Sequence, residues 1–172
     1  MKNILIFGPP GAGKGTQAKF ISEHFKIKHL STGDILRLKV EQKDDLGMTV
    51  KNILSSGKLV SDDILNKIVS EKLISEKIKG FILDGYPRTI EQANFLNNFL
   101  KDNNSNLDCI ISLELDFDVL KNRILKRSKE ENREDDNIDV IKTRYDAYIN
   151  STKKVSDLYK LNSGDIFFNI DG

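Results

Sequence analysis

A glycine-rich stretch near the start of the chain has the residue types and spacing to hold phosphate groups: Gly8-Pro9-Pro10-Gly11-Ala12-Gly13-Lys14-Gly15-Thr16. It follows the short apolar run Ile4-Leu5-Ile6-Phe7, which predicts a strand buried on both faces, and a helical pattern follows it. Glycines at such a turn allow backbone N–H groups to face phosphate oxygens at the positive end of a helix. The lysine can then reach the outer phosphates. The stretch therefore predicts a nucleotide phosphate loop (P-loop).

The loop departs from the general pattern at one position. A serine or threonine usually follows the lysine directly and binds magnesium, whereas here Gly15 stands between Lys14 and Thr16. This form resembles the nucleoside-monophosphate kinases. The resemblance implies that Mg²⁺ is held with ATP through water and phosphate oxygens near Thr16, without direct protein ligands. It also implies that ATP is bound by Gly11, Ala12, Gly13, Lys14, Gly15 and Thr16.

Two segments resemble the flap, residues 31–60, with which adenylate kinases bind AMP. In the first, Leu30-Ser31-Thr32-Gly33-Asp34-Ile35-Leu36-Arg37, the resemblance places the Thr32 hydroxyl against the adenine and Arg37 on the AMP phosphate. An arginine suits a phosphate because its planar fork offers two parallel charged donors. Outside this motif, Arg37 would be interpreted as an ordinary solvated residue. The second segment, Gly57-Lys58-Leu59-Val60, resembles the turn that holds the adenine, which implies contacts from Lys58, Leu59 and Val60.

The block Asp84-Gly85-Tyr86-Pro87-Arg88-Thr89 follows a second buried apolar run. An acidic side chain at the end of a buried strand is costly without a cationic partner, and water-bound magnesium beside the P-loop suits Asp84. The block resembles the second AMP-binding segment of adenylate kinases. That resemblance implies AMP contacts from Gly85, Tyr86, Pro87 and Arg88, and a hydrogen bond from Gln92 to the adenine edge.

Four arginines follow in the last third of the chain. Arg123 and Arg127 are spaced i, i+4 on one expected helix, Arg133 lies in a charged segment, and Arg144 lies on the next helix. Their order resembles the kinase lid. By that resemblance Arg123 and Arg127 would face ATP, while Arg133 and Arg144 would bind the phosphates on both sides of the transferring group, including the phosphate of AMP. Phosphoryl transfer needs charge neutralisation more than covalent help. The expected catalytic set is therefore Lys14, Asp84, Arg88, Arg127, Arg133 and Arg144.

The elements that position these residues alternate between short apolar runs and helical patterns, which predicts an α/β fold with a parallel sheet. The resemblance implies one three-layer P-loop NTPase domain, residues 1–172, with a five-stranded parallel sheet flanked by helices. We expect strands at residues 4–7, 27–30, 81–83, 109–115 and 166–170. We expect helices at residues 13–24, 48–54, 64–78, 89–101, 119–127 and 138–161, and another starting at 31–34.

The lid, residues 127–137, is expected to be the short form, because its length leaves no room for a zinc-bearing insertion. We therefore expect no zinc. In the family, the Asp-Gly after the last strand continues into a turn and a final helix, and Gly172 would lie beside the ATP base. Since the sequence stops at Gly172, we expect that C-terminal helix to be absent.

Composition bounds the remaining possibilities. The chain has 172 residues, 38% of them hydrophobic and 31% charged, and its net charge of +1 argues against a dedicated nucleic-acid or membrane binder. No apolar run approaches the roughly 20 residues of a membrane span, so we expect a cytoplasmic monomer. The single Cys109 excludes an internal disulfide and is interpreted as a core residue. His24 and His29 are interpreted as surface or packing residues.

The function implied by the resemblance is reversible phosphoryl transfer from Mg-ATP to AMP, giving two ADP in nucleotide biosynthesis. Two alternatives remain open. The nearest is a UMP/CMP kinase of the same fold, although Thr32 and the pair Arg88-Thr89 favour AMP. The other is a catalytically weak nucleotide-binding protein, against which the complete set of charged phosphate-binding residues argues.

Overall fold

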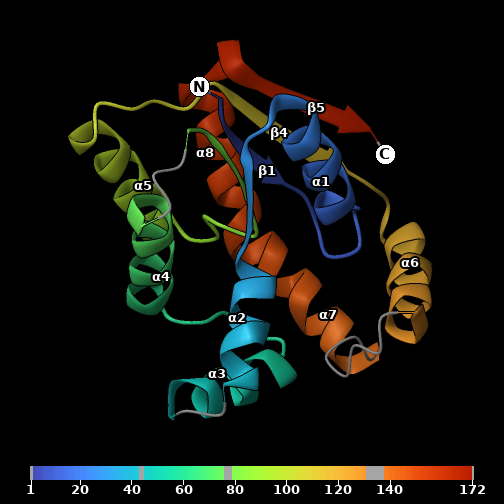
Figure 1. The fold of residues 1–172 in the computed structure, drawn as a ribbon. Coiled ribbons are helices and arrows are strands. Elements are labelled where there is room, and N and C mark those ends of the chain that lie inside the picture. Colours follow the sequence, from blue (N-terminus) through green and yellow to red (C-terminus); the bar gives the residue numbers. More distant parts are fainter. Residues whose placement is uncertain (1, 43–44, 76–78, 131–137, 172) are drawn as a thin grey trace.

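Five parallel strands form the sheet on which the site is built. The structure is a computed structural model that describes residues 2–42, 45–75, 79–130 and 138–171. The strands lie in the order β2-β3-β1-β4-β5 (Figure 1). Their bounds are β1 Asn3–Phe7, β2 Lys28–Ser31, β3 Phe81–Asp84, β4 Cys109–Glu114 and β5 Phe167–Asp171.

Helices connect these strands and account for the parallel arrangement, because each parallel connection must cross back over a face of the sheet. Their bounds are α1 Lys14–Phe25, α2 Thr32–Glu41, α3 Asp45–Ser55, α4 Asp62–Ser75, α5 Ile90–Asp102, α6 Phe117–Glu130, α7 Ile138–Ala147, α8 Lys153–Asn162, the π-helical η1 Tyr148–Thr152 and the 3-10 turn η2 Gly164–Ile166. In the described part of the chain, no helix combines the length and apolarity needed to cross a membrane. The predicted α/β fold with a five-stranded parallel sheet flanked by helices is confirmed.

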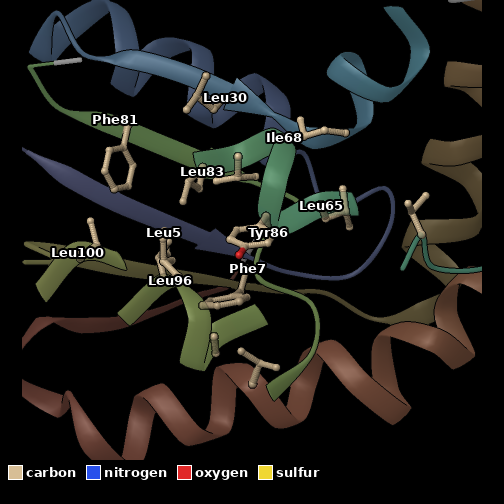
Figure 2. Close-up of a cluster of buried hydrophobic side chains, with 14 of the residues drawn as sticks. Leu5, Phe7, Leu30, Leu65, Ile68, Phe81, Leu83, Tyr86, Leu96 and Leu100 are labelled. Carbon is tan, nitrogen blue, oxygen red and sulfur yellow. The ribbon is translucent and has the colours of Figure 1, made fainter. Parts of the chain in front are cut away.

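The two faces of the sheet pack against different helices. Leu5 and Phe7 of β1 belong to one buried cluster together with side chains from α4, α5 and α8. Ile4 and Ile6, which alternate with them, belong to a second cluster with Ala18 of α1 and with α6. Figure 2 shows the first cluster, with Leu5, Phe7, Leu30, Leu65, Ile68, Phe81, Leu83, Tyr86, Leu96 and Leu100 labelled. Each fully buried leucine contributes about 1.5–3 kcal/mol, so this packing fixes the strand ends firmly.

The ends of three neighbouring strands meet at one edge of the sheet. Asp84, the last residue of β3, pairs with Ser31 of β2 and with Ile6 of β1. Helix α2 begins directly after Ser31, whose hydroxyl accepts the Asp34 N–H at 3.2 Å, as the predicted helix start at 31–34 requires. Figure 1 places α2, α3 and α7 together below the sheet. The segments predicted to bind nucleotides therefore begin at a common edge.

Two segments differ from the expected elements. Helix α6 extends to Glu130, past the expected end at residue 127, because lysine, arginine and glutamate are good helix formers even without an apolar face. The long helix expected at 138–161 is interrupted by η1, where the Lys153 N–H donates to the Tyr148 carbonyl five residues earlier. Residues 131–137 and 172 lie outside the described residues, so the short lid and the missing terminal helix stay predictions.

Candidate active site

A cavity of about 920 Å³ lies at the edge of the sheet where β1, β2 and β3 end. This volume is near the upper end of the roughly 300–1,000 Å³ typical of small-molecule sites. The predicted residues that line it are Gly11, Gly13, Lys14, Gly15, Thr16, Thr32, Arg37, Lys58, Leu59, Val60, Asp84, Gly85, Tyr86, Pro87, Arg88, Arg123 and Arg144. Of the predicted residues with described side chains, Ala12 and Gln92 do not line it.

The phosphate loop joins β1 to α1, as its sequence context predicts. Lys14 folds over the loop, and its Nζ donates to the carbonyls of Gly8 and Pro9, each at 2.9 Å. A Cβ added at Gly11 would lie 2.7 Å from Cγ1 of Ile124, so α6 packs directly on the loop and excludes a side chain there. Ala12 points into the core instead and is 5% exposed. The loop can therefore offer phosphates its backbone and one lysine ammonium.

Asp84 lies beside the phosphate loop at the end of β3. Its Oδ2 is 3.5 Å from the position that a Cβ on Gly15 would take, so the carboxylate faces the start of α1. Thr16 lies on the wall of the same cavity. Carboxylate and hydroxyl oxygens suit Mg²⁺, which keeps most of its water shell and takes few protein ligands. Among the described residues there is no cluster of three or more His, Cys, Asp or Glu side chains suited to a metal ion.

His29, interpreted from the sequence as a surface or packing residue, lines the cavity in the structure. His29 pairs with Ile82 in the parallel register, and alternation places it on the same face of the sheet as Asp84. Its Nε2 is buried 3.5 Å from Asp84 Oδ2, and among the described residues it makes no hydrogen bond. The alternation of the strand could have revealed it, had the register with β3 been known.

Gly85 permits two site residues to approach the same carbonyl. Arg88 Nε donates to the Gly85 carbonyl at 2.7 Å, and the Thr32 hydroxyl donates to it at 2.9 Å. Gly85 has φ +79°, and an added Cβ would lie 2.7 Å from Thr32 Oγ1 and 2.8 Å from Arg88 Nη2. A side chain at this position would be strained and would push apart the predicted adenine and phosphate contacts.

Three arginines from three separate elements bring like charges to the cavity. Arg37 of α2 forms an ion pair with Asp34, Arg88 follows β3, and Arg144 comes from α7. Burial lowers the pKa of the Arg88 guanidinium, Asp84 opposes that shift, and the charges of Arg144 and Arg37 lower the pKa further. Like charges held together in this way favour an anionic ligand.

The turn predicted to hold the adenine, residues 57–60, is packed against α7, the helix that carries Arg144. A Cβ added at Gly57 would lie 3.1 Å from Cγ1 of Val140 and 3.4 Å from Cγ of Arg144. Lys58, exposed, and Val60, buried, follow this glycine on the cavity wall. The turn predicted to hold the adenine of AMP therefore lies directly against the helix of Arg144, which is predicted to bind the phosphates.

Tyr86 and Gln92 hold the segment after β3 in place through hydrogen bonds of their buried side chains. The Tyr86 hydroxyl donates to Asn66 Oδ1 at 2.5 Å, and burial raises the pKa of this phenol. Gln92 is fully buried; its Oε1 accepts the Arg88 N–H at 2.7 Å, and its Nε2 donates to Asp62 Oδ1 at 2.7 Å. The adenine contact of Gln92 stays a prediction, and the structure shows a supporting role for the residue that the sequence did not indicate.

The lid arginines are only partly within the described structure. Arg123 lies on α6, exposed, and lines the cavity. Arg127 also belongs to α6, but its side chain lies outside the description, as do the residues Arg133 and Gly172 entirely. The roles predicted for these three stay predictions.

Further cavity residues come from elements with no recognisable motif. Lys19 and Glu23 lie on α1, Lys126 lies on α6, and Tyr148 and Thr152 lie on η1. Burial raises the pKa of Tyr148 to about 12, with Asp157 and Glu114 adding to the shift. The sequence offers no spacing signal for these positions, because only the folded helices bring them to the cavity.

Comparison with known proteins identifies relatives along nearly the whole chain. A family model described as adenylate kinase matches residues 6–164. An adenylate kinase from Nocardioides sp. is 41% identical over 170 residues, which span 98% of this chain and 88% of the relative. Adenylate kinases from Prochlorococcus marinus (strain MIT 9301) and Leptospira biflexa are 44% and 42% identical, covering 92% and 93% of this chain and 85% and 87% of the relatives.

Proposed function

The chain belongs to the adenylate kinase family and catalyses reversible phosphoryl transfer between ATP and AMP, and from that premise we propose how its residues divide the reaction. The observation that carries the proposal is the meeting of a phosphate loop, a strand-end carboxylate and three arginines around one cavity. The loop binds the donor nucleotide, and the arginines bind the acceptor and the phosphoryl group in transit.

The donor side consists of the phosphate loop and α6. The backbone of residues 11–16 holds the ATP phosphates at the N-terminus of α1, and Lys14 exchanges its carbonyl partners for the outer phosphates. Arg123 and Arg127 contact ATP from α6, and the family resemblance assigns Gly172 to the ATP base. When bound with ATP, Mg²⁺ neutralises charge on the phosphate oxygens; Asp84 and Thr16 would hold it through water.

The acceptor side consists of the flap and the segment after β3. Arg37 and Arg88 bind the AMP phosphate, Arg133 and Arg144 bridge it to the transferring group, and Gly85 with Pro87 forms the wall. Thr32, the turn Lys58-Leu59-Val60, Tyr86 and Gln92 hold the adenine. The like charges around Arg88 support this assignment, because an anion there relieves their repulsion.

Transfer proceeds directly and in line, without a phosphorylated enzyme. The AMP phosphate is already anionic, so the attacking oxygen needs no general base. The contribution of the protein is positioning and charge neutralisation within a cleft closed against water by residues 127–137. Incubation with γ-labelled ATP and no acceptor should leave the protein unlabelled, and stoichiometric label on the protein would contradict direct transfer.

A coupled assay with AMP, UMP, CMP and GMP as acceptors tests the function. We expect ADP formation with AMP to exceed that with each other acceptor, with an absolute requirement for Mg²⁺. The Lys14→Ala variant, prepared in parallel, supplies the background from contaminating kinases. Absence of product above this background with every acceptor would contradict the kinase assignment, whereas preference for UMP or CMP would contradict only the adenine assignment.

We further propose that the enzyme acts as a cytoplasmic monomer that needs no zinc and no nucleic-acid partner. The even balance of charge supports the absence of a nucleic-acid partner. Light scattering after size exclusion should give the mass of one chain, and a dimer mass would contradict it. Metal analysis of active protein purified in a chelator should find less than one zinc per ten chains.

A further inference from the structure

Asp62, the first residue of α4, joins the start of that helix to the acceptor segment. Its Oδ2 accepts the Thr89 hydroxyl at 2.9 Å, and its Oδ1 accepts Gln92 Nε2 at 2.7 Å. Gln92 Oε1 in turn accepts the Arg88 backbone N–H at 2.7 Å. One half-buried carboxylate thus connects the starts of α4 and α5 with the backbone of Arg88, the residue proposed to bind the AMP phosphate.

This arrangement fixes which way the Gln92 amide points. The two ends of a glutamine amide look alike in shape, and their assignment depends on their partners. Here the Arg88 N–H can only donate, so it requires the oxygen, and the Asp62 carboxylate can only accept, so it requires the nitrogen. Turning the amide over would place like groups against each other at both ends. Gln92 is fully buried, so water cannot compensate that loss.

We propose that Asp62 is a positioning residue that sets acceptor-base selectivity by locking the Gln92 amide in one orientation; this rests on the proposed AMP site. Adenine presents an acceptor, N1, beside a donor, the N6 amino group, whereas guanine presents the donor N1–H beside the acceptor O6. An amide that can turn over can pair with either base edge. An amide fixed by Asp62 pairs with one edge only, and the base with the reversed edge leaves buried polar groups unpaired.

Asp62 acts only through other residues. It is not part of the cavity wall, whereas Arg88, which it holds through Gln92, is. The same link should also hold the Arg88 backbone in place for the AMP phosphate. Loss of the carboxylate should therefore weaken AMP binding and relax base selectivity while leaving the ATP side unchanged.

The test compares Asp62→Ala with Asp63→Ala. Asp63 is the next residue of the same first helical turn and is exposed, so its removal matches the change in charge and helix-dipole interaction. With Asp62→Ala we expect KM for AMP to rise roughly tenfold, the value for losing a charge-assisted hydrogen bond. KM for ATP should change less than twofold, and the rate ratio of GMP to AMP should rise roughly tenfold. CMP, whose edge has the same order of groups as adenine, should not gain on AMP.

The Asp62→Asn variant is the conservative rescue. Its amide oxygen can accept from Gln92 and its nitrogen can donate to the Thr89 hydroxyl oxygen, so KM for AMP and selectivity should stay within about threefold of the wild type. Asp62→Ala behaving like Asp63→Ala in both readouts would overturn the proposal. Equal rises in KM for ATP and AMP, with a lower Tm and unchanged GMP-to-AMP ratio, would also overturn it, because Asp62 would then be only structural.

A second pair of variants keeps the proposal testable if Asp62→Ala does not fold. Gln92→Glu places a carboxylate against Asp62 and should raise KM for AMP strongly. Adding Asp62→Asn supplies a donor to the new carboxylate and should recover at least tenfold of that loss. Independent, multiplicative effects of the two changes would show that the side chains do not act as a unit. Activity of the wild type in the same assay separates these outcomes from a failure of the AMP assignment itself.

Discussion

The phosphate loop and the arginine cluster face one cavity but are constructed differently. Residues 8–16 are consecutive, and Lys14 finds its partners within the loop itself, at the carbonyls of Gly8 and Pro9. Arg37, Arg88 and Arg144 come from α2, the segment after β3 and α7, and no local sequence relates them. The loop binds phosphate through a rigid local backbone, whereas the cluster depends on the docking of whole elements. Removal of the loop lysine should therefore cost more activity than removal of any one arginine of the cluster.

Lys14→Ala should have the largest effect of any single change. It removes the one lysine ammonium of the loop, and loss of one preorganised charge at a transferring group costs roughly 10²–10³-fold or more. We expect kcat to fall about 10³-fold, with AMP affinity by calorimetry unchanged because the acceptor side is separate. A fall in kcat of less than tenfold would show that the arginines can replace the lysine. It would contradict the proposed difference between the loop and the arginine cluster.

Arg88→Ala should reduce kcat/KM for AMP by roughly 10²-fold, with KM for ATP nearly unchanged. The fold should tolerate the change, because burial, together with Arg144 and Arg37, disfavours this charge more than Asp84 favours it. We expect Tm to stay the same or to rise. Arg88→Lys keeps the charge but loses the fork and should recover only part of the activity. Unfolding of Arg88→Ala would show that the residue is structural.

Gly85→Ala should weaken AMP binding by straining the backbone after β3. Positive φ and the approach of Thr32 and Arg88 should cost about 1–3 kcal/mol of unfolding free energy, and KM for AMP should rise more than KM for ATP. Gly164→Ala is the matched control, since an added Cβ there meets no atom within 4 Å. Equal Tm values for the two variants would contradict the tight packing around Gly85.

Gly15→Ala should have the smallest effect. An added Cβ would be in ordinary contact, 3.5 Å from Asp84 Oδ2, and alanine in this exposed helical position should add about 0.5–1 kcal/mol of stability. We expect a slightly higher Tm, with kcat changed less than tenfold and any loss appearing at limiting Mg²⁺. A lower Tm would show that the loop tolerates no side chain even where the structure leaves room.

Much of the fold could be predicted because local signals and tertiary packing agreed. The runs at 4–7 and 81–83 are apolar on both faces, as central strands of a parallel sheet must be, and Ser31 and Thr89 cap the helices that follow their segments. The interruption at η1 could not be predicted, since it depends on a backbone hydrogen bond that leaves the side-chain pattern unchanged.

Two site residues, Gln92 and His29, make contacts that the sequence did not predict. The adenine contact expected of Gln92 stays a prediction, and the structure adds that Gln92 joins Asp62 to the Arg88 backbone. His29 was interpreted as a surface or packing residue, and the structure adds that its Nε2 lies 3.5 Å from Asp84 Oδ2. In both cases the residue type was compatible with several environments, and the partner that decided between them lay on another element.

The sequence by itself determined the phosphate loop, its joining of strand to helix and the set of charged residues available to bind phosphates. These follow from neighbouring residues, whose geometry the backbone fixes within a few bonds. Only the tertiary structure decided that Arg37, Arg88 and Arg144 share one cavity, that His29 faces Asp84 and that Asp62 accepts a hydrogen bond from Gln92. Such contacts depend on the register of the strands and on the packing of helices across the sheet, and residues distant in the sequence carry no local record of either.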